Sequence, residues 1–313
     1  MTRAFVFPGQ GSQSVGMGKA LAEAFPQARA VFDEVDDALS QKLSALMWEG
    51  PAEELTLTAN TQPALMAVSL AAIRVLEGEA GLDLKRDAAY VAGHSLGEYS
   101  ALAAAGSLSV ADTARLLRIR GNAMQSAVPV GQGAMAALLG LEFEAALAVA
   151  RDAAQGEVCD AANDNGGAQV VVSGHKAAVE RAVKIAGERG AKRAVMLPVS
   201  APFHCALMQP AADAMREALA AVPVRSPAVP VVANVEAGPL TDPDRIRDAL
   251  VRQVTGTVRW RECVAFMAGQ GVDSFVEVGA GKVLTGLAKR IAPGAQASAV
   301  GTPDDVAAFK AQP

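Results

Sequence analysis

Cysteine is scarce in this chain of 313 residues. The three cysteines, Cys159, Cys205 and Cys263, form no C-x-x-C pair, and their number is odd. These features argue against a disulfide framework and against a zinc cluster, so we expect no metal site. A reducing compartment fits this cysteine usage better than an oxidising one.

Long apolar runs are also missing, because Gly, Ser and charged residues interrupt every candidate before it could span a bilayer. The N-terminus passes from Met1-Thr2-Arg3 directly into a strand-like run, Ala4–Phe7, which leaves no room for a signal or transit peptide. We therefore expect a cytoplasmic protein without a membrane partner.

The chain has no excess of positive charge, since its formal net charge is −5 and its pI about 5.4. Nucleic acid and anionic membranes both need a positive surface, so neither is expected as a main partner. Aromatic residues make up 4% of the chain, whereas 51% of all residues are hydrophobic. The core must therefore be built from Ala, Val and Leu, as in helix-rich α/β proteins.

Short apolar runs alternate with longer helical patterns, which predicts a mostly parallel sheet covered by helices. One long helix is expected from Gln62 to Glu77, with Pro63 near its start, where proline is tolerated. Residues 133 to 198 follow the order β-α-β-β-α-β, the ferredoxin-like split motif. We predict a ferredoxin-like small domain, residues 128–198, inserted into a large α/β domain formed by residues 1–127 and 199–313.

The large domain contains the pattern Gly93-x-Ser95-x-Gly97 after a predicted buried strand and before a predicted helix. This context is typical of the nucleophile elbow of α/β-hydrolase-like domains, where a sharp turn exposes the serine oxygen. Strand and helix crowd each other at such a turn, so only glycine fits two positions to either side. The amide of Leu96 would lie at the helix N-terminus, where it can stabilise an oxyanion.

A serine nucleophile needs a base, and the chain has three histidines. His94 adjoins the elbow and is expected to be a core residue, whereas His175 is expected to cap a surface helix. His204, in a short rigid loop of the large domain, is the better base. Cys205 is expected to be a small buried thiol, because adjacent side chains usually point apart.

No aspartate in a characteristic loop stands out between Ser95 and His204, where α/β-hydrolases place their acid. Something other than a carboxylate would then orient the histidine. A serine and a histidine alone fit a hydrolase or a transferase equally well, so the reaction stays open at this level.

Four motifs in one order resemble the malonyl-CoA:acyl carrier protein transacylase family over nearly the whole chain. They are Phe7-Pro8-Gly9-Gln10-Gly11-Ser12-Gln13, Gly93-His94-Ser95-Leu96-Gly97-Glu98-Tyr99-Ser100, Arg120-Gly121 and His204-Cys205-Ala206-Leu207-Met208. The resemblance implies an acyltransferase that moves malonyl groups from coenzyme A to acyl carrier protein through malonyl-Ser95. It implies no cofactor, and we expect a monomer.

The resemblance also implies roles for individual residues. It implies a Ser95–His204 dyad, an oxyanion hole from the backbone amides of Gln10 and Leu96, and Arg120 as the partner of the malonyl carboxylate. Without it, Arg120 would be taken as a solvated helix-surface cation. The backbone carbonyl of Gln253 would orient the histidine in place of the missing aspartate, whereas Asn163 and Asn165 would line the cleft between the domains.

Leu96 and Phe203 resemble the malonyl-selective form of the family, since a bulky Phe203 leaves little space for an α-methyl group. Discrimination by one methyl is worth only about 1–3 kcal/mol, so this selectivity need not be absolute. The chain departs from the usual pattern at Thr257 and Ala280, where proline is more common. Both positions lie in predicted loops, outside the expected chemistry.

Three other functions are compatible with parts of the sequence: a serine hydrolase or thioesterase, a nucleotide-binding module suggested by Gly9-x-Gly11, and a docking module without catalysis. The nucleotide fingerprint lacks its third glycine and its acidic residue. Docking of an acidic carrier protein would use a local basic patch. The candidates are Arg181, Lys184, Arg189, Lys192 and Arg193 on the small domain, or Lys282, Lys289 and Arg290.

Overall fold

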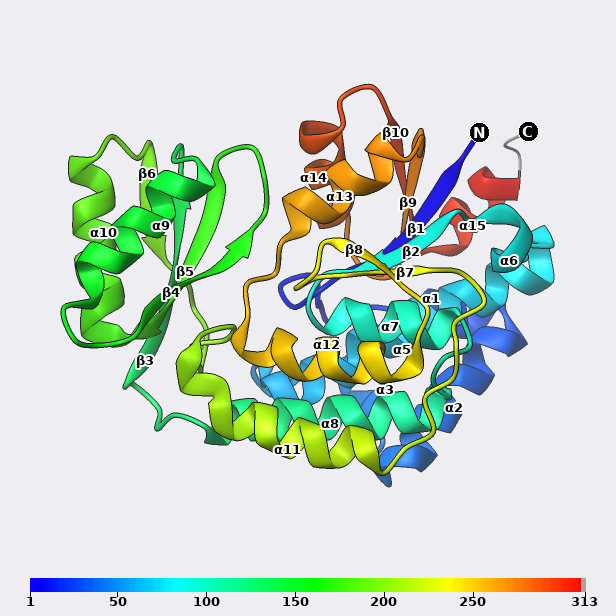
Figure 1. The fold of residues 1–313 in the computed structure, drawn as a ribbon. Helices are drawn as coiled ribbons and strands as arrows, with labels where there is room; N and C mark the ends of the chain where they lie inside the picture. The colour runs from blue at the N-terminus through cyan, green and yellow to red at the C-terminus, as the bar shows by residue number, and fades with distance from the viewer. Residues whose placement is uncertain (311–313) are drawn as a thin grey trace.

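Two β-sheets organise the chain, and the computed structural model describes residues 1–310 (Figure 1). The larger sheet has six strands in the order β10-β9-β1-β2-β7-β8, and all of its described pairs are parallel except β7–β8. This confirms the predicted α/β class with a mostly parallel sheet. The strands are β1 (Arg3–Phe7), β2 (Tyr90–Gly93), β7 (Val231–Ala233), β8 (Gly238–Leu240), β9 (Ser274–Val278) and β10 (Gln296–Val300).

Strand β1 lies inside this sheet and is buried on both faces. Successive side chains of a strand point to opposite faces, so Phe5 and Phe7 join one apolar cluster while Ala4 and Val6 join another. Helices α13 (Trp260–Gly269) and α14 (Val283–Ile291) complete the second cluster. A strand with continuous apolar character is thereby fixed at the centre of the fold.

The first cluster is the main core of the protein. Its helices are α1 (Lys19–Ala24), α2 (Pro26–Leu39), α3 (Leu43–Glu49), α4 (Ala52–Thr56), α5 (Thr58–Ala80), α6 (Leu84–Asp87), α7 (Leu96–Ala104), α8 (Val110–Ser126), α11 (Gln209–Ala220), α12 (Pro243–Thr255) and α15 (Pro303–Lys310). In the view of Figure 1 most of these helices pack below the sheet, whereas α6 and α15 lie to its right.

The smaller sheet has four antiparallel strands in the order β4-β5-β3-β6 and forms a separate layer at the left of Figure 1. With its two helices it follows the βαββαβ order expected of a ferredoxin-like unit. Its elements all lie within residues 128–198, and the exact domain boundaries stay a prediction. They are β3 (Gly133–Leu139), α9 (Phe143–Ala154), β4 (Cys159–Asp164), β5 (Gln169–His175), α10 (Lys176–Glu188) and β6 (Arg193–Met196).

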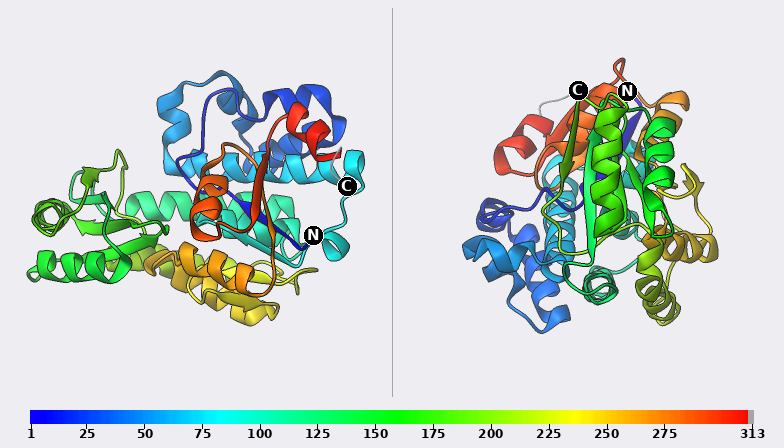
Figure 2. Two further views of the ribbon diagram at one scale, coloured as in Figure 1. Left: turned by 90° about the horizontal axis from the view of Figure 1, so that it is seen from above. Right: turned by 90° about the vertical axis from the view of Figure 1, so that its left-hand side faces the viewer.

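The small sheet has its own core on the helical face, whereas Met135 and Val171 on its other face join the main core. Main-chain hydrogen bonds also join the two parts, which lie side by side in Figure 2. The N–H of Asp164 donates to the carbonyl of Val258 at 2.9 Å, and the N–H of Val258 donates to that of Ala162 at 2.8 Å. These bonds hold β4 beside the large domain and fix one wall of the space between the sheets.

The long helix α5 differs from its expected bounds. It begins at Thr58, so Pro63 lies inside the helix rather than near its start as predicted. Helix α8 packs closely against this additional turn at Gly121, where a Cβ would lie 2.6 Å from the Cα of Ala59. Burial against α8 stabilises the first turn and outweighs the hydrogen bond that the proline cannot donate.

Gly97 lies where α7 passes the end of β1. A Cβ at this position would lie 2.2 Å from the carbonyl oxygen of Phe7, a backbone atom with little freedom to move. We expect Gly97→Ala to lower the free energy of unfolding by about 1–3 kcal/mol, the usual cost of overpacking a buried site. Urea unfolding monitored by circular dichroism measures this change.

Gly187, inside α10, supplies the control, because no atom beyond the backbone of its own helix lies within 4 Å of the position that a Cβ would take there. Alanine favours the helix more than glycine does, so Gly187→Ala should raise the free energy of unfolding by about 0.5–1 kcal/mol. A Gly97→Ala protein as stable as the wild type would contradict the close approach of helix and strand.

Candidate active site

Ser95 occupies the turn between β2 and α7 with the unusual backbone angles φ 54° and ψ −111°. The glycines on either side make this turn possible. A Cβ at Gly93 would lie 1.9 Å from the carbonyl group of Gly97, far inside van der Waals contact. The elbow predicted from the sequence is therefore present, and it exposes the serine hydroxyl at the carboxyl end of the sheet.

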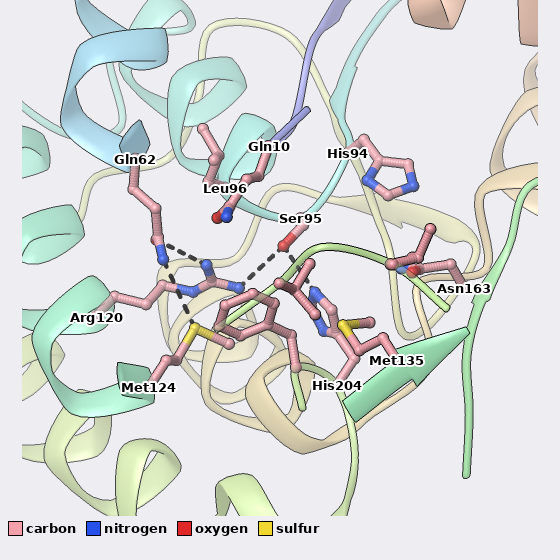
Figure 3. A pocket seen from close by; sticks show the side chains of 13 residues that line it. Gln10, Gln62, His94, Ser95, Leu96, Arg120, Met124, Met135, Asn163 and His204 are labelled. Atoms are coloured by element: carbon pink, nitrogen blue, oxygen red, sulfur yellow. Dashed lines mark hydrogen bonds between the residues drawn. The ribbon is translucent and has the colours of Figure 1, made fainter. Parts of the chain in front are cut away.

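The imidazole of His204 lies beside this hydroxyl (Figure 3). Ser95 Oγ is 2.7 Å from His204 Nε2, and His204 Nδ1 is 2.8 Å from the backbone carbonyl oxygen of Gln253. Because a carbonyl oxygen can only accept, Nδ1 carries the proton and Nε2 is free to accept the proton of the serine. A backbone carbonyl thus occupies the position that a carboxylate has in a Ser-His-Asp triad.

His204 is held in the neutral form of a base. It belongs to the loop between β6 and α11 and is 4% exposed. Burial, followed by the nearby charge of Arg120, lowers the pKa of His204 to about 3, although the Gln253 carbonyl acts in the opposite direction. An unprotonated imidazole is therefore available throughout the neutral range.

Arg120 extends from α8 into the same site, with 1% of its surface exposed. Its Nη1 donates to Gln62 Oε1 at 2.8 Å, and its Nη2 donates to Ser95 Oγ at 3.2 Å (Figure 3). The same Nη2 also donates to Gln253 Oε1 at 2.8 Å. Within residues 1–310 no carboxylate lies within ion-pair distance of it. Arg120 is not a solvated surface cation but a buried guanidinium with neutral partners, and burial lowers its pKa.

Gln10 and Leu96 line the same cavity as the serine and come from two parts of the chain. Gln10 follows β1, and its side-chain Oε1 accepts a hydrogen bond from Thr58 at 2.9 Å. Leu96 begins α7 directly after the nucleophile. Among the described residues, no acceptor takes the backbone N–H of either residue, so both remain available to an oxyanion.

A cavity opens in front of the serine between the two sheets. The polar side chains that line it are Gln10, Gln62, His94, Ser95, Arg120, Asn163 and His204. The remainder is apolar, and is formed by Leu96, Met124, Met135, Leu197, Val199 and Phe203. An apolar pocket with a few convergent polar groups suits a small acyl chain with one charged end.

Known proteins resemble this chain in sequence and in fold. The model of the family described as "Acyl transferase domain" matches residues 4–304. The chain belongs to this family. It is 50% identical over 305 residues to the malonyl CoA-acyl carrier protein transacylase of Escherichia coli (strain K12), covering 97% of each chain, and 46% identical to that of Bacillus subtilis (strain 168), covering 97% of this chain and 94% of the other.

Solved structures of the acyl transferase family share the fold. An acyl-carrier-protein-S-malonyltransferase from Bartonella henselae is 59% identical and superposes with a TM-score of 0.97, covering 99% of this chain and 98% of that one. A malonyl-transacylase in complex with a type II polyketide acyl carrier protein is 45% identical with a TM-score of 0.95, covering 98% of both chains. These findings confirm the family that the sequence motifs suggested.

Other expected residues of the acyl transferase site lie at different depths. Asn163 and Phe203 line the cavity, whereas the side chain of Asn165 lies behind it, with Oδ1 2.9 Å from Nε2 of His94. Cys205 lies beside the base, but its thiol donates to the carbonyl of Pro202 at 3.1 Å, and burial raises the pKa of this thiol to about 11. Cys205 is therefore not positioned as a rival nucleophile.

Sequence reasoning missed three buried polar residues that support the site: Gln62, Glu98 and Asn234. Glu98 Oε2 accepts from the backbone N–H of Asn234 and from Gln253 Nε2, both at 2.9 Å. Burial raises the pKa of Glu98 to about 7, although these two donors lower it. A polar residue at the carboxyl end of an apolar run, as Asn234 is after Val231–Ala233, was a signal that could have been used.

The pKa of His204 leads to a direct measurement. Because its pKa in the folded protein lies near 3 instead of 6.5, the ring should stay neutral with its proton on Nδ1 as the pH falls from 8 to 5. Nitrogen-15 NMR of labelled imidazole rings reports the tautomer and the charge. A His204 titration midpoint near 6.5 would contradict the buried, carbonyl-bonded ring.

Proposed function

We propose that this protein transfers the malonyl group of malonyl-CoA to the phosphopantetheine thiol of acyl carrier protein through an ester on Ser95. The observation that supports this most is the buried Arg120 guanidinium beside the serine hydroxyl. Arginine recognises a carboxylate with two parallel hydrogen bonds, and malonyl thioesters carry a carboxylate at the far end. Such a group would have no role in a site for neutral acyl chains.

The first half of the reaction forms the malonyl-enzyme. His204 Nε2 accepts the Ser95 proton while Oγ attacks the thioester carbonyl carbon. The resulting oxyanion is stabilised by the backbone amides of Gln10 and Leu96. Collapse of this intermediate breaks the carbon–sulfur bond, and coenzyme A leaves as a thiol with the proton from His204.

The second half follows the same path in reverse with a different thiol. His204 removes the proton of the phosphopantetheine thiol, and the sulfur attacks the ester carbonyl of malonyl-Ser95. The bond between the acyl carbon and Oγ breaks, and the serine regains its proton from His204. The reaction is therefore ping-pong, and these steps require no metal and no cofactor from the protein.

Acyl selectivity is assigned to two side chains. Hydrogen bonds to charged groups are worth about 1.5–3 kcal/mol, so Arg120 favours malonyl over acetyl chains. Phe203 narrows the cavity next to the base and disfavours an α-methyl group by about 1–3 kcal/mol. Transfer of methylmalonyl groups is expected to be slower but not abolished.

The relatives support the choice of partner. One solved neighbour is described as a malonyl-transacylase bound to a type II polyketide acyl carrier protein, and we propose the same class of partner here, serving fatty acid or polyketide chain extension. A cytoplasmic location and a monomeric state stay predictions. No helix among the described residues has the length and apolar character needed to cross a bilayer.

The expected basic patches are partly engaged within the chain itself. On the small domain, Arg181 pairs with Glu157 at 2.7 Å, and Arg189 pairs with Asp152. Lys184, Lys192 and Arg193 remain candidates for the carrier protein, together with Lys282, Lys289 and Arg290.

A nucleotide-binding role is not supported by the geometry of its motif. A Cβ at Gly9 would lie 2.7 Å from the carbonyl oxygen of His94, so this glycine is explained by the approach of the β1 loop to the elbow. A serine hydrolase would share Ser95 and His204, but water would take the place of the second thiol. Whether the malonyl-enzyme passes its acyl group to a thiol or to water separates these functions.

Intact-mass measurement after mixing with malonyl-CoA or acetyl-CoA tests the proposal. The wild type should gain a malonyl adduct and lose it when holo acyl carrier protein, which carries the accepting thiol, is added. In Arg120→Ala the rate of malonyl transfer should fall about 10- to 100-fold, because hydrogen bonds to the carboxylate worth roughly 1.5–3 kcal/mol are lost. The rate of acetyl transfer should stay equal or rise.

Ser95→Ala is the matched control, since it removes one oxygen atom and leaves the substrate pocket in place. No adduct should form on it with either donor. A malonyl adduct on Ser95→Ala, or an unchanged malonyl-to-acetyl preference in Arg120→Ala, would contradict the proposed mechanism.

A further inference from the structure

Asn234 lies beneath the nucleophile and takes part in none of the steps above. It follows β7 directly and is fully buried. Its Oδ1 accepts the backbone N–H of Ser95 at 2.8 Å, and its Nδ2 donates to the carbonyl oxygen of Gly93 at 2.8 Å. One carboxamide therefore holds the main chain on both sides of His94.

The elbow needs this contact because the sheet ends there. Strands β2 and β7 are paired in parallel up to Ala92 and Val232, and β7 then turns into the hairpin with β8. The carbonyl of Gly93 and the N–H of Ser95 consequently find no main-chain partner from β7. Buried main-chain groups require partners, and the side chain of Asn234 provides both at once.

The backbone of the elbow is also strained. A positive φ of 54° is uncommon for a residue with a side chain, and such conformations persist only where their surroundings fix them. The two hydrogen bonds from Asn234 oppose relaxation of the turn at Ser95. Relaxation would move Oγ away from the imidazole and turn the Leu96 amide away from the oxyanion.

Asn234 is itself fixed by the polar groups behind the site. Its backbone N–H donates to Glu98 Oε2 at 2.9 Å. The same carboxylate oxygen accepts from Gln253 Nε2 at 2.9 Å, and this nitrogen is 3.3 Å from Asn234 Oδ1. Because the carbonyl of Gln253 also orients His204, the supports of nucleophile and base belong to one hydrogen-bonded network.

We propose that Asn234 is a positioning residue that fixes the nucleophile elbow and thereby sets the rate of attack by Ser95. This inference rests on the proposed function, because the rate in question is that of Ser95 attacking an acyl donor. The carboxamide touches only main-chain atoms of the elbow, so it acts equally on acyl groups with and without a carboxylate. Acyl preference stays with Arg120.

Steady-state kinetics with malonyl-CoA and acetyl-CoA test this role. Misplacement of a reacting group by about 1 Å can cost on the order of 10²-fold in rate, so Asn234→Ala should lower kcat by about that factor for both donors. KM should change little, and the malonyl-to-acetyl ratio should equal that of the wild type. Arg120→Ala, in contrast, changes this ratio.

Reaction with a small fluorophosphonate provides a readout that needs no malonyl group. Ser95 Oγ displaces fluoride from phosphorus and His204 accepts the proton, so the rate reports the elbow and the base alone. Asn234→Ala should be phosphonylated more slowly by the same factor as its loss in kcat. A wild type that reacts with the phosphonate but accepts no malonyl group would overturn the proposed function while leaving this inference intact.

Two further variants keep the test decisive. Asn234→Asp has the same shape and can still accept from Ser95, but its ionised form turns an acceptor oxygen toward the carbonyl of Gly93, so its kcat should fall below that of the wild type. If Asn234→Ala does not fold, Asn234→Asp takes its place in the same measurements. Val232→Ala in the preceding β7 loses core packing but leaves both hydrogen bonds of Asn234 to the elbow in place, so it should keep the wild-type kcat. Folded Asn234 variants with wild-type kcat and phosphonylation rate would overturn the inference.

Discussion

A single hydroxyl group connects three distant parts of the chain. Ser95 Oγ is in contact with His204, 109 positions further along, and with Arg120, 25 positions further along. An alcohol is a weak nucleophile until a base accepts its proton. The fold therefore has to hold an imidazole and a guanidinium on one oxygen atom, and the surrounding structure is explained by this requirement.

Gln253 serves both of these groups. Its backbone carbonyl fixes the proton of His204 on Nδ1, and its side-chain oxygen accepts from Arg120. Its side-chain nitrogen donates to the carbonyl oxygen of Ser95 at 3.0 Å. One residue at the end of α12 thus contacts the serine, the imidazole and the guanidinium that we propose binds the malonyl carboxylate. Because the amide is neutral, it does not cancel the positive charge of Arg120.

Much of this arrangement could be predicted because it depends on local pattern. The elbow requires glycine at positions 93 and 97, and the pattern of apolar residues predicts the βαββαβ order of the small domain. Other features depend on tertiary contacts and were missed. The extra turn of α5 forms because α8 covers it at Gly121. Strand β10 is a half-exposed edge strand with a weak hydrophobic pattern. Asn234 can bind the elbow only once β7 lies beside it. The Arg120 side chain, taken alone, looked like a surface charge, and only the family motifs suggested its role in the site.

A crystal structure of the malonyl-enzyme, trapped on Ser95, would show which groups bind the malonyl carboxylate. We expect the malonyl carboxylate to accept two hydrogen bonds from Arg120, displacing at least one of its glutamine partners. We also expect the ester carbonyl oxygen to lie against the backbone amides of Gln10 and Leu96. A malonyl carboxylate that points into solvent, with Arg120 still bound to Gln62 and Gln253, would contradict the proposed role of Arg120.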